Sequence, residues 1–225
     1  MRYIHGIFVV NRPDLLKLAV QSVKCLWPHA FILDNSPGGH IGMEHKWPIP
    51  VVRPNVPLST AQGMNFMYRM AREQGADAFG YQHNDAEAGK GSARKYLKVV
   101  KDAFSRGRKW ATVFTYYDLI AGYNVRAVDE IGEWDTHFPQ PTYHFDVDWF
   151  HRARLCGYEL IESGVPMTHH NGESNTIKSD DHWQRLNALK FPMNETYYLA
   201  KWGGPTHAEK FATPWDEKAA LENSE

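Results

Sequence analysis

Short apolar runs alternate with amphipathic segments through the first half of the chain. Residues 3–10 are rich in β-forming side chains, and the following Asn11-Arg12-Pro13-Asp14 combines a turn signal with a proline suited to a first helical turn. Apolar residues then recur at helical spacing as far as Cys25, which predicts one buried helix face. A second apolar run at 30–33 completes a β-α-β unit, whose two strands we expect to be parallel.

The alternation of strand and helix continues to about residue 104. Ser59 and Gln62 have the spacing of a capping box, which starts a helix that Gly75 ends. The other elements predicted up to residue 104 are strands at 51–53 and 78–82 and a helix at 93–104. In the less regular second half, we predict strands at 110–117, 123–125 and 158–165 and helices at 127–131 and 146–156.

This order of elements predicts an α/β fold with a mostly parallel, mixed central sheet flanked by helices. A length of 225 residues suits one large domain, which we place at residues 1–175. Beyond Ser174 the sequence is aromatic and rich in turn residues. We therefore expect residues 176–225 to form an irregular aromatic C-terminal extension that packs on the same domain and ends in a frayed, charged tail.

Charge and composition exclude several classes of protein. Lys and Arg number 25 against 26 Asp and Glu, so no overall field attracts nucleic acid or an anionic membrane. The chain has no run near the roughly 18 apolar residues of a membrane-spanning helix, and its first residues lack a signal-peptide layout. Two cysteines are too few for a disulfide scaffold or a thiolate zinc site. We expect a soluble cytoplasmic protein without a transmembrane segment.

Three polar residues each directly follow a predicted strand. They are Asn11, Asp34 and Asp85, which are far apart in the sequence. Ligands of open α/β sheets bind at the carboxyl ends of the strands, where loops and helix N-termini meet. Each residue alone is equally well explained as a turn residue or a helix cap. Their coincidence predicts one shared crevice.

Asp85 is the strongest candidate for a metal ligand. It ends the sequence His83-Asn84-Asp85, and a carboxylate at a strand end can hold a hard divalent cation that neutralises nucleotide phosphates. His169 or His170, at the end of the last predicted strand, could join it in binding Mn²⁺ or Mg²⁺. The alternatives are a helix-capping Asp and a hydrogen-bonded structural His. Zinc is disfavoured because the chain has no HExxH motif or cysteine pair.

Asp146 and Asp148 lie at the start of a predicted helix and, two residues apart, point in different directions. One can serve as an N-cap or a first-turn acid, and the other is then free to accept a proton from a substrate hydroxyl. The glycines match neither GxGxxG nor a P-loop, and no GxSxG sequence occurs. A Rossmann dehydrogenase, a P-loop kinase and an α/β-hydrolase are therefore disfavoured.

Taken in order, these segments resemble the inverting family 2 glycosyltransferases of the GT-A fold. FVVNRPDLL at 8–16 is similar to that family's first strand and turn, LDNS at 33–36 to its second strand end, and YQHNDAE at 81–87 to its DxD segment. YNVR at 123–126 with IGEWD at 131–135, FDVD at 145–148 with RARLCGY at 152–158, and HHNGES at 169–174 are similar to later motifs. The resemblance covers roughly residues 3–175 and rests on the order of weak motifs.

This resemblance implies a GT-A-like domain and a metal-dependent inverting transfer from a UDP or dTDP sugar to an acceptor hydroxyl. Asp146 would be the general base, and Asp85 and His169 would hold Mn²⁺ or Mg²⁺. The residues that would contact the donor are Val10, Asn11, Asp34, Asn65, His83, Asn84 and Asp85, with Asp34 reading the base. Those that would face the acceptor are Trp134, Asp135 and Asp148. The chain departs from the family where His83 replaces the first acid of DxD and Phe145 replaces a Glu.

Two other functions remain open at this point. A nucleotidyltransferase can use the same fold, but it needs a glycine-rich basic loop that Asn11-Arg12-Pro13-Asp14 does not supply. A non-catalytic module could instead bind a sugar nucleotide through the abundant Trp and His residues, without turnover.

The acceptor is equally open: a polysaccharide, a lipid-linked sugar, a protein or a modified DNA base. A DNA acceptor requires a basic face. The residues that could form one are Arg53, Lys90, Arg94, Lys95, Lys98 and Lys101, and the alternative is an ordinary solvated helix face.

Overall fold

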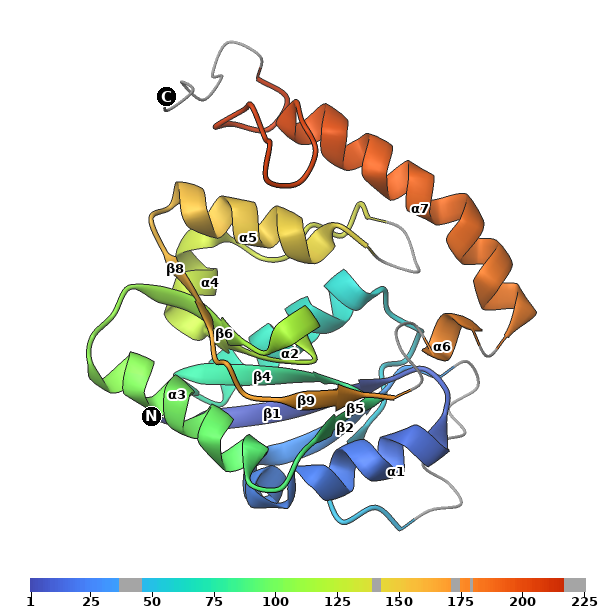
Figure 1. Cartoon of the computed structure of the whole chain (residues 1–225), viewed down its shortest axis with the longest axis vertical. Coiled ribbons are helices and arrows are strands. Elements are labelled where there is room, and N and C mark those ends of the chain that lie inside the picture. Colours follow the sequence, from blue (N-terminus) through green and yellow to red (C-terminus); the bar gives the residue numbers. More distant parts are fainter. Residues whose placement is uncertain (37–45, 139–142, 171–174, 179, 217–225) are drawn as a thin grey trace.

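The computed structural model describes residues 1–36, 46–138, 143–170, 175–178 and 180–216, and its centre is a seven-stranded sheet (Figure 1). The strand order is β3-β2-β1-β4-β7-β6-β8. The strands are β1 (Tyr3–Val9), β2 (Ala30–Asp34), β3 (Val51–Val52), β4 (Ala78–His83), β6 (Trp110–Phe114), β7 (Ile120–Asn124) and β8 (Glu159–Glu162). Only β7 runs antiparallel to its neighbours. The predicted α/β class with a mostly parallel, mixed sheet is confirmed.

The prediction of one strand over 158–165 is wrong for its second half. β8 ends at Glu162, and Val165 is held instead by a hydrogen bond from its N–H to the Ser163 hydroxyl. After this bend the chain forms β9 (Met167–His169), which pairs antiparallel with β5 (Ala86–Ala88) in a separate two-stranded sheet. Gly164, with a φ of +63°, allows the bend that the apolar pattern conceals.

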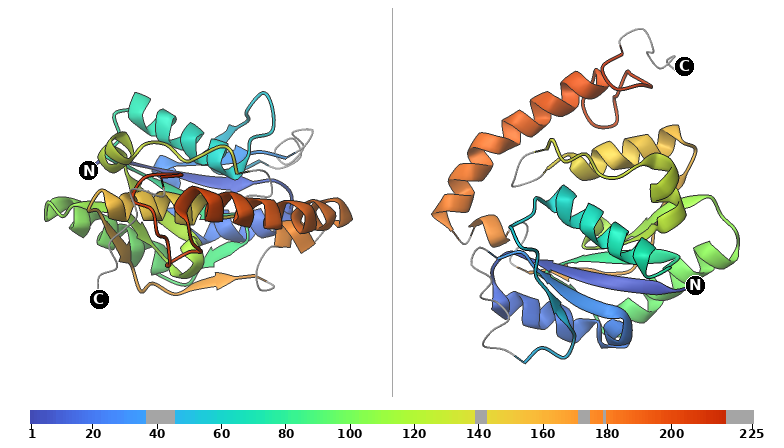
Figure 2. Two further views of the ribbon diagram at one scale, coloured as in Figure 1. Left: turned by 90° about the horizontal axis from the view of Figure 1, so that it is seen from above. Right: turned by 180° about the vertical axis from the view of Figure 1, so that it is seen from behind.

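Helices cover both faces of the sheet, as the two views of Figure 2 show. One face carries α1 (Pro13–Ser22), the 3₁₀ helix η1 (Lys24–His29) and α3 (Ser92–Ser105), and the other carries α2 (Thr60–Glu73), α4 (Val125–Ile131) and α5 (Phe145–Leu155). The sheet therefore has two cores. Ile7 of β1 packs in the core on the α1 side and Phe8 in the core on the α2 side, because successive side chains of a strand point to opposite faces.

Local sequence explains where α2 begins and how closely it packs. The Ser59 hydroxyl accepts a hydrogen bond from the Gln62 N–H at 3.1 Å, and the Gln62 side chain accepts one from the Ser59 N–H at 2.7 Å. The predicted capping box is thus confirmed. A Cβ atom at Gly63 would lie 2.5 Å from the Phe8 ring, so glycine at this position lets α2 approach β1.

The sequence predicts an irregular C-terminal extension, but most of the extension that the structure describes is helical. It contains α6 (Asn175–Lys178) and the 22-residue helix α7 (Asp181–Trp202), which runs along one side of the molecule past α5 (Figure 1). The Asp180 carboxylate caps α7 through the His182 N–H, and Gly203 ends the helix with a φ of +70°. Aromatic residues around the helix and Pro192 within it hid the helical pattern. The division at residues 175 and 176 stays a prediction.

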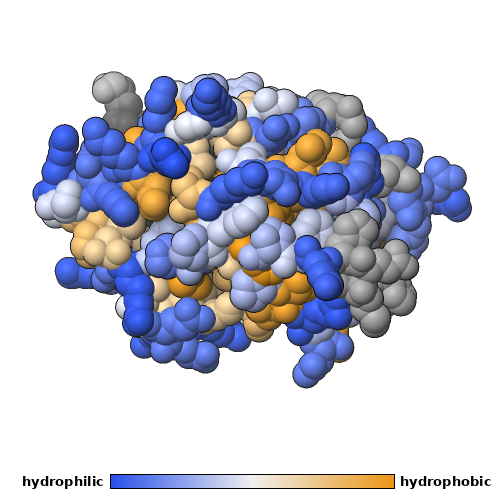
Figure 3. All heavy atoms as spheres, turned by 90° about the horizontal axis from the view of Figure 1, so that it is seen from below, coloured by the Kyte–Doolittle hydropathy of each residue, from blue (hydrophilic) through white to orange (hydrophobic). Residues whose placement is uncertain are grey.

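The outer face on the side of α1 and α3 is shown in Figure 3, where hydrophilic side chains surround small apolar patches. Four basic residues of α3 are exposed: Arg94, Lys95, Lys98 and Lys101. They lie opposite the buried side of α3, as expected for the solvated face of an amphipathic helix. Among the described helices, none combines the length and the apolar character that a membrane span requires.

A buried lysine attaches α7 to α5. The Lys201 ammonium lies 2.7 Å from Asp135 Oδ2 and 2.7 Å from Asp148 Oδ1, and the Trp202 indole N–H donates to Asp148 Oδ1 at 2.8 Å. Arg152 donates to the other Asp148 oxygen at 3.0 Å. Burial opposes ionisation of Asp135, but the hydrogen bonds from Lys201 and His137 outweigh it and hold the pKa of Asp135 far below its usual range.

Lys201→Ala is expected to lower the free energy of unfolding by about 3–5 kcal/mol, because it removes the buried cation that Asp135 and Asp148 share. Urea denaturation followed by circular dichroism measures this loss. The matched control is Lys210→Ala, an exposed site whose substitution should change stability by about 0.5 kcal/mol or less. Equal stability of the two variants would contradict the anchoring role of Lys201.

A buried histidine in β1 makes stability depend on pH. His5 Nε2 lies 2.8 Å from Gln82 Oε1 and its Nδ1 lies 3.2 Å from the Tyr3 hydroxyl. Burial lowers the pKa of His5 to about 4, although the hydrogen bond to Gln82 favours the charged ring. The unfolded chain, with a pKa near 6.5, therefore binds a proton between pH 6.5 and 4 that the folded chain does not.

The free energy of unfolding should accordingly fall as the pH decreases through that window. His5 should account for a loss of about 3 kcal/mol by pH 4. Urea denaturation at a series of pH values measures the slope, and His5→Gln should flatten it. A slope that is the same in His5→Gln and in the parent chain would show that His5 is not responsible.

Candidate active site

The carboxyl ends of three parallel strands meet at one edge of the sheet. The register pairs Val9 of β1 with Asp34 of β2, and Phe8 with His83 of β4. Asp34, the last residue of β2, and Asn11 and Asp85, which follow β1 and β4, are therefore brought to the same edge, as the sequence predicts. The loops are also bonded to each other, because the Asn84 side-chain amide donates to the Asn11 carbonyl at 3.0 Å. Val10 lies between the β1 strand and this contact.

Asp34, which is expected to bind the nucleotide base, is buried and forms an ion pair with Arg53. Asp34 is only 2% exposed, and its Oδ2 accepts from Arg53 Nε at 3.0 Å while its Oδ1 accepts from the Ser36 N–H at 3.2 Å. Asn65, also expected to contact the donor, lies on α2. Its amide is bonded on both sides to the backbone of Trp134, at 2.8 and 2.9 Å, so it fixes that loop instead of facing the strand ends.

His83, Asp85 and His169 form a cluster whose ligand atoms all lie within 4.8 Å of one another. His169 Nε2 lies 3.3 Å from Asp85 Oδ2, and His83 Nδ1 lies 3.9 Å from Asp85 Oδ1. The distant His169 reaches this cluster because it pairs with Ala86 in the β5–β9 ladder. The late motif continues through 171–174, which lie outside the described residues.

The donor set of this cluster fits a divalent cation. His169 Nε2 is buried and makes no hydrogen bond with the described residues, as a ligand nitrogen requires. Burial lowers the pKa of His83 to about 4, although the charge of Asp85 opposes this shift, so the ring is neutral at pH 7 and has a lone pair to offer. Two imidazoles and one carboxylate suit Mn²⁺ better than Ca²⁺, and Mg²⁺ would use mainly Asp85.

Two further acids complete the site, and the sequence analysis identified only one of them. Asp146 lies in the first turn of α5 and interacts electrostatically with the second acid, Asp118. Asp118, which the analysis missed, has its Oδ1 3.9 Å from His83 Nε2. Burial, and then the charge of Asp146, raise the pKa of Asp118 well above its usual range. Burial also raises the pKa of Asp146, against the backbone N–H groups of the helix N-terminus.

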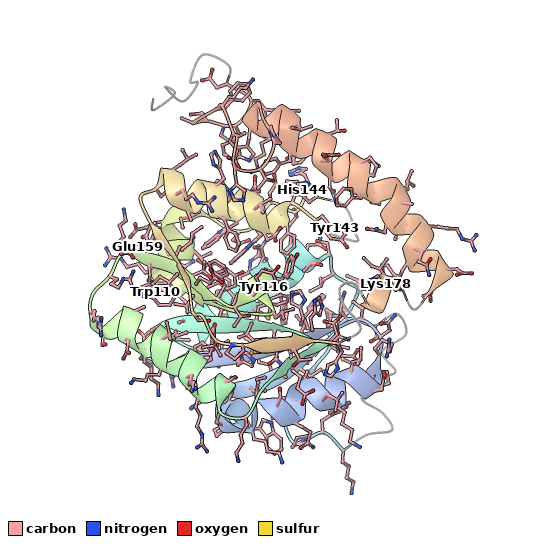
Figure 4. All side chains as sticks on the ribbon, viewed as in Figure 1. Trp110, Tyr116, Tyr143, His144, Glu159 and Lys178 are labelled. Carbon is pink, nitrogen blue, oxygen red and sulfur yellow. The ribbon has the colours of Figure 1, made fainter. Side chains whose placement is uncertain are left out.

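The backbone is strained on both sides of these acids. Tyr117 and Asp118 have φ values of +53° and +44°, and His144, which precedes α5, has a φ of +68°. Such left-handed conformations cost about 1–3 kcal/mol each in residues other than glycine, and they persist where the surrounding structure holds them. Figure 4 shows His144 and its neighbour Tyr143 between α5 and α7, where their rings contact Phe191 at centroid distances of 5.6 and 5.1 Å.

The three residues expected to face the acceptor do not form a surface at the site. Trp134 is 2% exposed and stacks on Trp149 at 4.7 Å, and Asp148 is completely buried against α7. Asp135 accepts hydrogen bonds from Lys201 and from the Tyr197 hydroxyl. Asp148 is buried because the helical period turns it away from the side of α5 that carries Asp146.

Comparison with known proteins adds a likeness in fold. No protein-family model matches the sequence, and no curated protein matches it. Among 204 matching chains of solved structures is the mannosyltransferase PcManGT from Pyrobaculum calidifontis, in complex with GDP-mannose and Mn²⁺. The TM-score is 0.53 at 12% identity, over 72% of this chain and 54% of that one.

The fold, an α/β domain with a seven-stranded mixed sheet, is similar to that of this glycosyltransferase. The chain spans about half the length of PcManGT, matching 54% of it, and at this identity the likeness concerns the fold alone.

Proposed function

We propose that the protein is a metal-dependent, inverting glycosyltransferase that transfers a sugar from a nucleoside-diphosphate sugar to an acceptor hydroxyl. The observation that supports this most is the cluster of His83, Asp85 and His169 at the edge where β1, β2 and β4 end. Asp118 lies 3.9 Å from His83 in this cluster and interacts electrostatically with Asp146. An open α/β sheet binds its ligand at such an edge, so the donor and the candidate base meet there.

The donor would lie along the strand ends. Asp34, through its carboxylate oxygens, would accept hydrogen bonds from the base, with Arg53 as the neighbouring donor. Asn11 and Asn84 would line the diphosphate, and Mn²⁺ or Mg²⁺ held by Asp85, His83 and His169 would supply the positive charge that stabilises the leaving diphosphate. We propose UDP or dTDP as the carrier. GDP belongs in the same test because the related mannosyltransferase was solved with GDP-mannose.

Asp146 would act as the general base. Its carboxylate takes the proton from the acceptor hydroxyl while that oxygen attacks the anomeric carbon, and the bond from this carbon to the diphosphate oxygen breaks with its electron pair going to the diphosphate. The raised pKa of Asp146 makes it a better proton acceptor than an ordinary aspartate. Because a single displacement occurs, the configuration at the anomeric carbon is inverted.

A panel of UDP, dTDP and GDP sugars tests this proposal. We expect one donor to raise the melting temperature with Mn²⁺ but not with EDTA, since a ligand at 100 times its Kd stabilises by about 2.7 kcal/mol. The same donor should release its nucleoside diphosphate on incubation. Tight binding without release under any metal would favour a binding module. Formation of a nucleoside triphosphate and a sugar 1-phosphate when inorganic pyrophosphate is added would favour a nucleotidyltransferase.

A further inference from the structure

The turn between β6 and β7 carries two large aromatic side chains at the surface. Tyr116 is 67% exposed and Tyr117 is 54% exposed, and their rings lie edge to face with centroids 4.2 Å apart. Tyrosine has an apolar body that is normally at least partly buried. Two adjacent exposed rings are therefore a feature that stability does not explain.

The turn is held rigidly in this conformation. The Thr115 N–H donates to the Ile120 carbonyl at 3.0 Å, the Ile120 N–H donates to the Thr115 hydroxyl at 3.0 Å, and the Asp118 N–H donates to the Thr115 carbonyl at 2.8 Å. Thr115 itself is completely buried. This clamp maintains the left-handed backbone of Tyr117 and Asp118, so both rings are presented with little conformational freedom left to lose on binding.

The same turn leads directly into the candidate active site. Asp118, next to the two tyrosines, lies 3.9 Å from His83 Nε2 and interacts electrostatically with Asp146. Figure 4 shows Tyr116 between the sheet and α5. A ligand on the tyrosine rings would therefore lie beside Asp118, which interacts electrostatically with the candidate base Asp146.

We infer that Tyr116, Tyr117 and Asp118 form the acceptor subsite and that the acceptor is a neutral saccharide. This inference rests on the proposed function. A sugar presents an apolar face of C–H groups that stacks on aromatic rings, and its hydroxyls donate hydrogen bonds to a carboxylate such as Asp118. Asp85, Asp118 and Asp146 all interact electrostatically with Tyr81, and such acidic groups offer no cation that would bind a polyanionic acceptor such as DNA.

The test compares transfer to a sugar with transfer to water, using the donor that the wild type hydrolyses. The neutral probes are methyl glycosides and disaccharides of glucose, galactose, mannose and N-acetylglucosamine, and the anionic probes are methyl glucuronide and a duplex containing 5-hydroxymethylcytosine. Mass spectrometry measures the transfer product in each case, and free sugar measures hydrolysis. We expect transfer to at least one neutral saccharide and none to the anionic probes.

In the double variant Tyr116→Ala/Tyr117→Ala, the ratio of transfer to hydrolysis should fall about tenfold, and the acceptor KM should rise. Tyr116→Phe/Tyr117→Phe keeps both rings and should retain the ratio. Phe104→Ala, which removes a partly exposed ring from α3, is the matched control and should leave both rates unchanged.

Three results would overturn the inference while leaving the proposed function in place: hydrolysis without transfer to any neutral saccharide, transfer to an anionic probe alone, or an unchanged ratio in the double alanine variant. A wild-type protein that hydrolyses no sugar nucleotide would remove the proposed function and this inference with it.

Discussion

Asp85→Ala is expected to lower kcat/KM for metal-dependent nucleotide release by about 10³-fold or more, because the cluster loses its only carboxylate and the developing charge on the diphosphate loses its cation. A coupled assay for the released nucleoside diphosphate measures the loss over a range of Mn²⁺ concentrations. Raising the Mn²⁺ concentration should recover part of the activity of Asp85→Asn, which keeps one oxygen ligand, and none of the activity of Asp85→Ala.

Asp102→Ala is the matched control for this experiment. Asp102 lies on α3, outside the site, so its removal should leave both the Mn²⁺ requirement and the rate unchanged. Melting curves of all variants check that the fold is retained. If Asp85→Ala kept the wild-type rate and Mn²⁺ dependence, the cluster would have no part in the reaction.

Asp146→Asn is expected to lower kcat for sugar transfer by about 10²–10⁴-fold while the donor still binds, because the amide keeps the shape of the side chain but cannot accept the proton. The two effects are separated by measuring transfer rates and, independently, the donor-induced rise in melting temperature. A loss of donor binding together with kcat would show that Asp146 serves the donor and is not the base.

Asp148→Asn, two residues from Asp146, is the variant to compare with Asp146→Asn. Because Asp148 accepts from Arg152, Lys201 and Trp202, this substitution should lower the free energy of unfolding and weaken the attachment of α7. Below its melting temperature the variant should still transfer sugar. Similar kinetic losses in Asp146→Asn and Asp148→Asn would contradict the separate roles that the two acids have in the structure.

Most of the site could be predicted from the sequence, because ligands of open α/β sheets bind at the carboxyl ends of the strands. The prediction left out the end of one strand, β6. It identified Asn11, Asp34 and Asp85, and the register brings their strands to one edge. β6 is parallel to β4 because both pair antiparallel with β7, so Asp118 after β6 belongs to the same edge. Asp118 also directly follows the strand predicted at 110–117, so the signal that would have found it was present.

Other features of the site were not readable from residue types. The left-handed backbone at Tyr117 and His144 is imposed by tertiary contacts, and no glycine or asparagine marks these positions. Similarly, motif order suggested that Trp134 and Asp148 face an acceptor. Trp134 is instead buried against Trp149 of α5. The burial of Asp148 involves α7, which was itself not predicted because its aromatic residues do not follow a single helical stripe.

The most direct test of the account is a titration of the protein with Mn²⁺, in which electron paramagnetic resonance measures the free ion. We predict one equivalent of Mn²⁺ bound by the wild type in the presence of the donor, and an affinity at least about tenfold weaker in each of His83→Ala, Asp85→Ala and His169→Ala. Unchanged binding of one equivalent in all three variants, or no bound Mn²⁺ in the wild type, would contradict the proposal that these side chains form the metal centre of a glycosyltransferase.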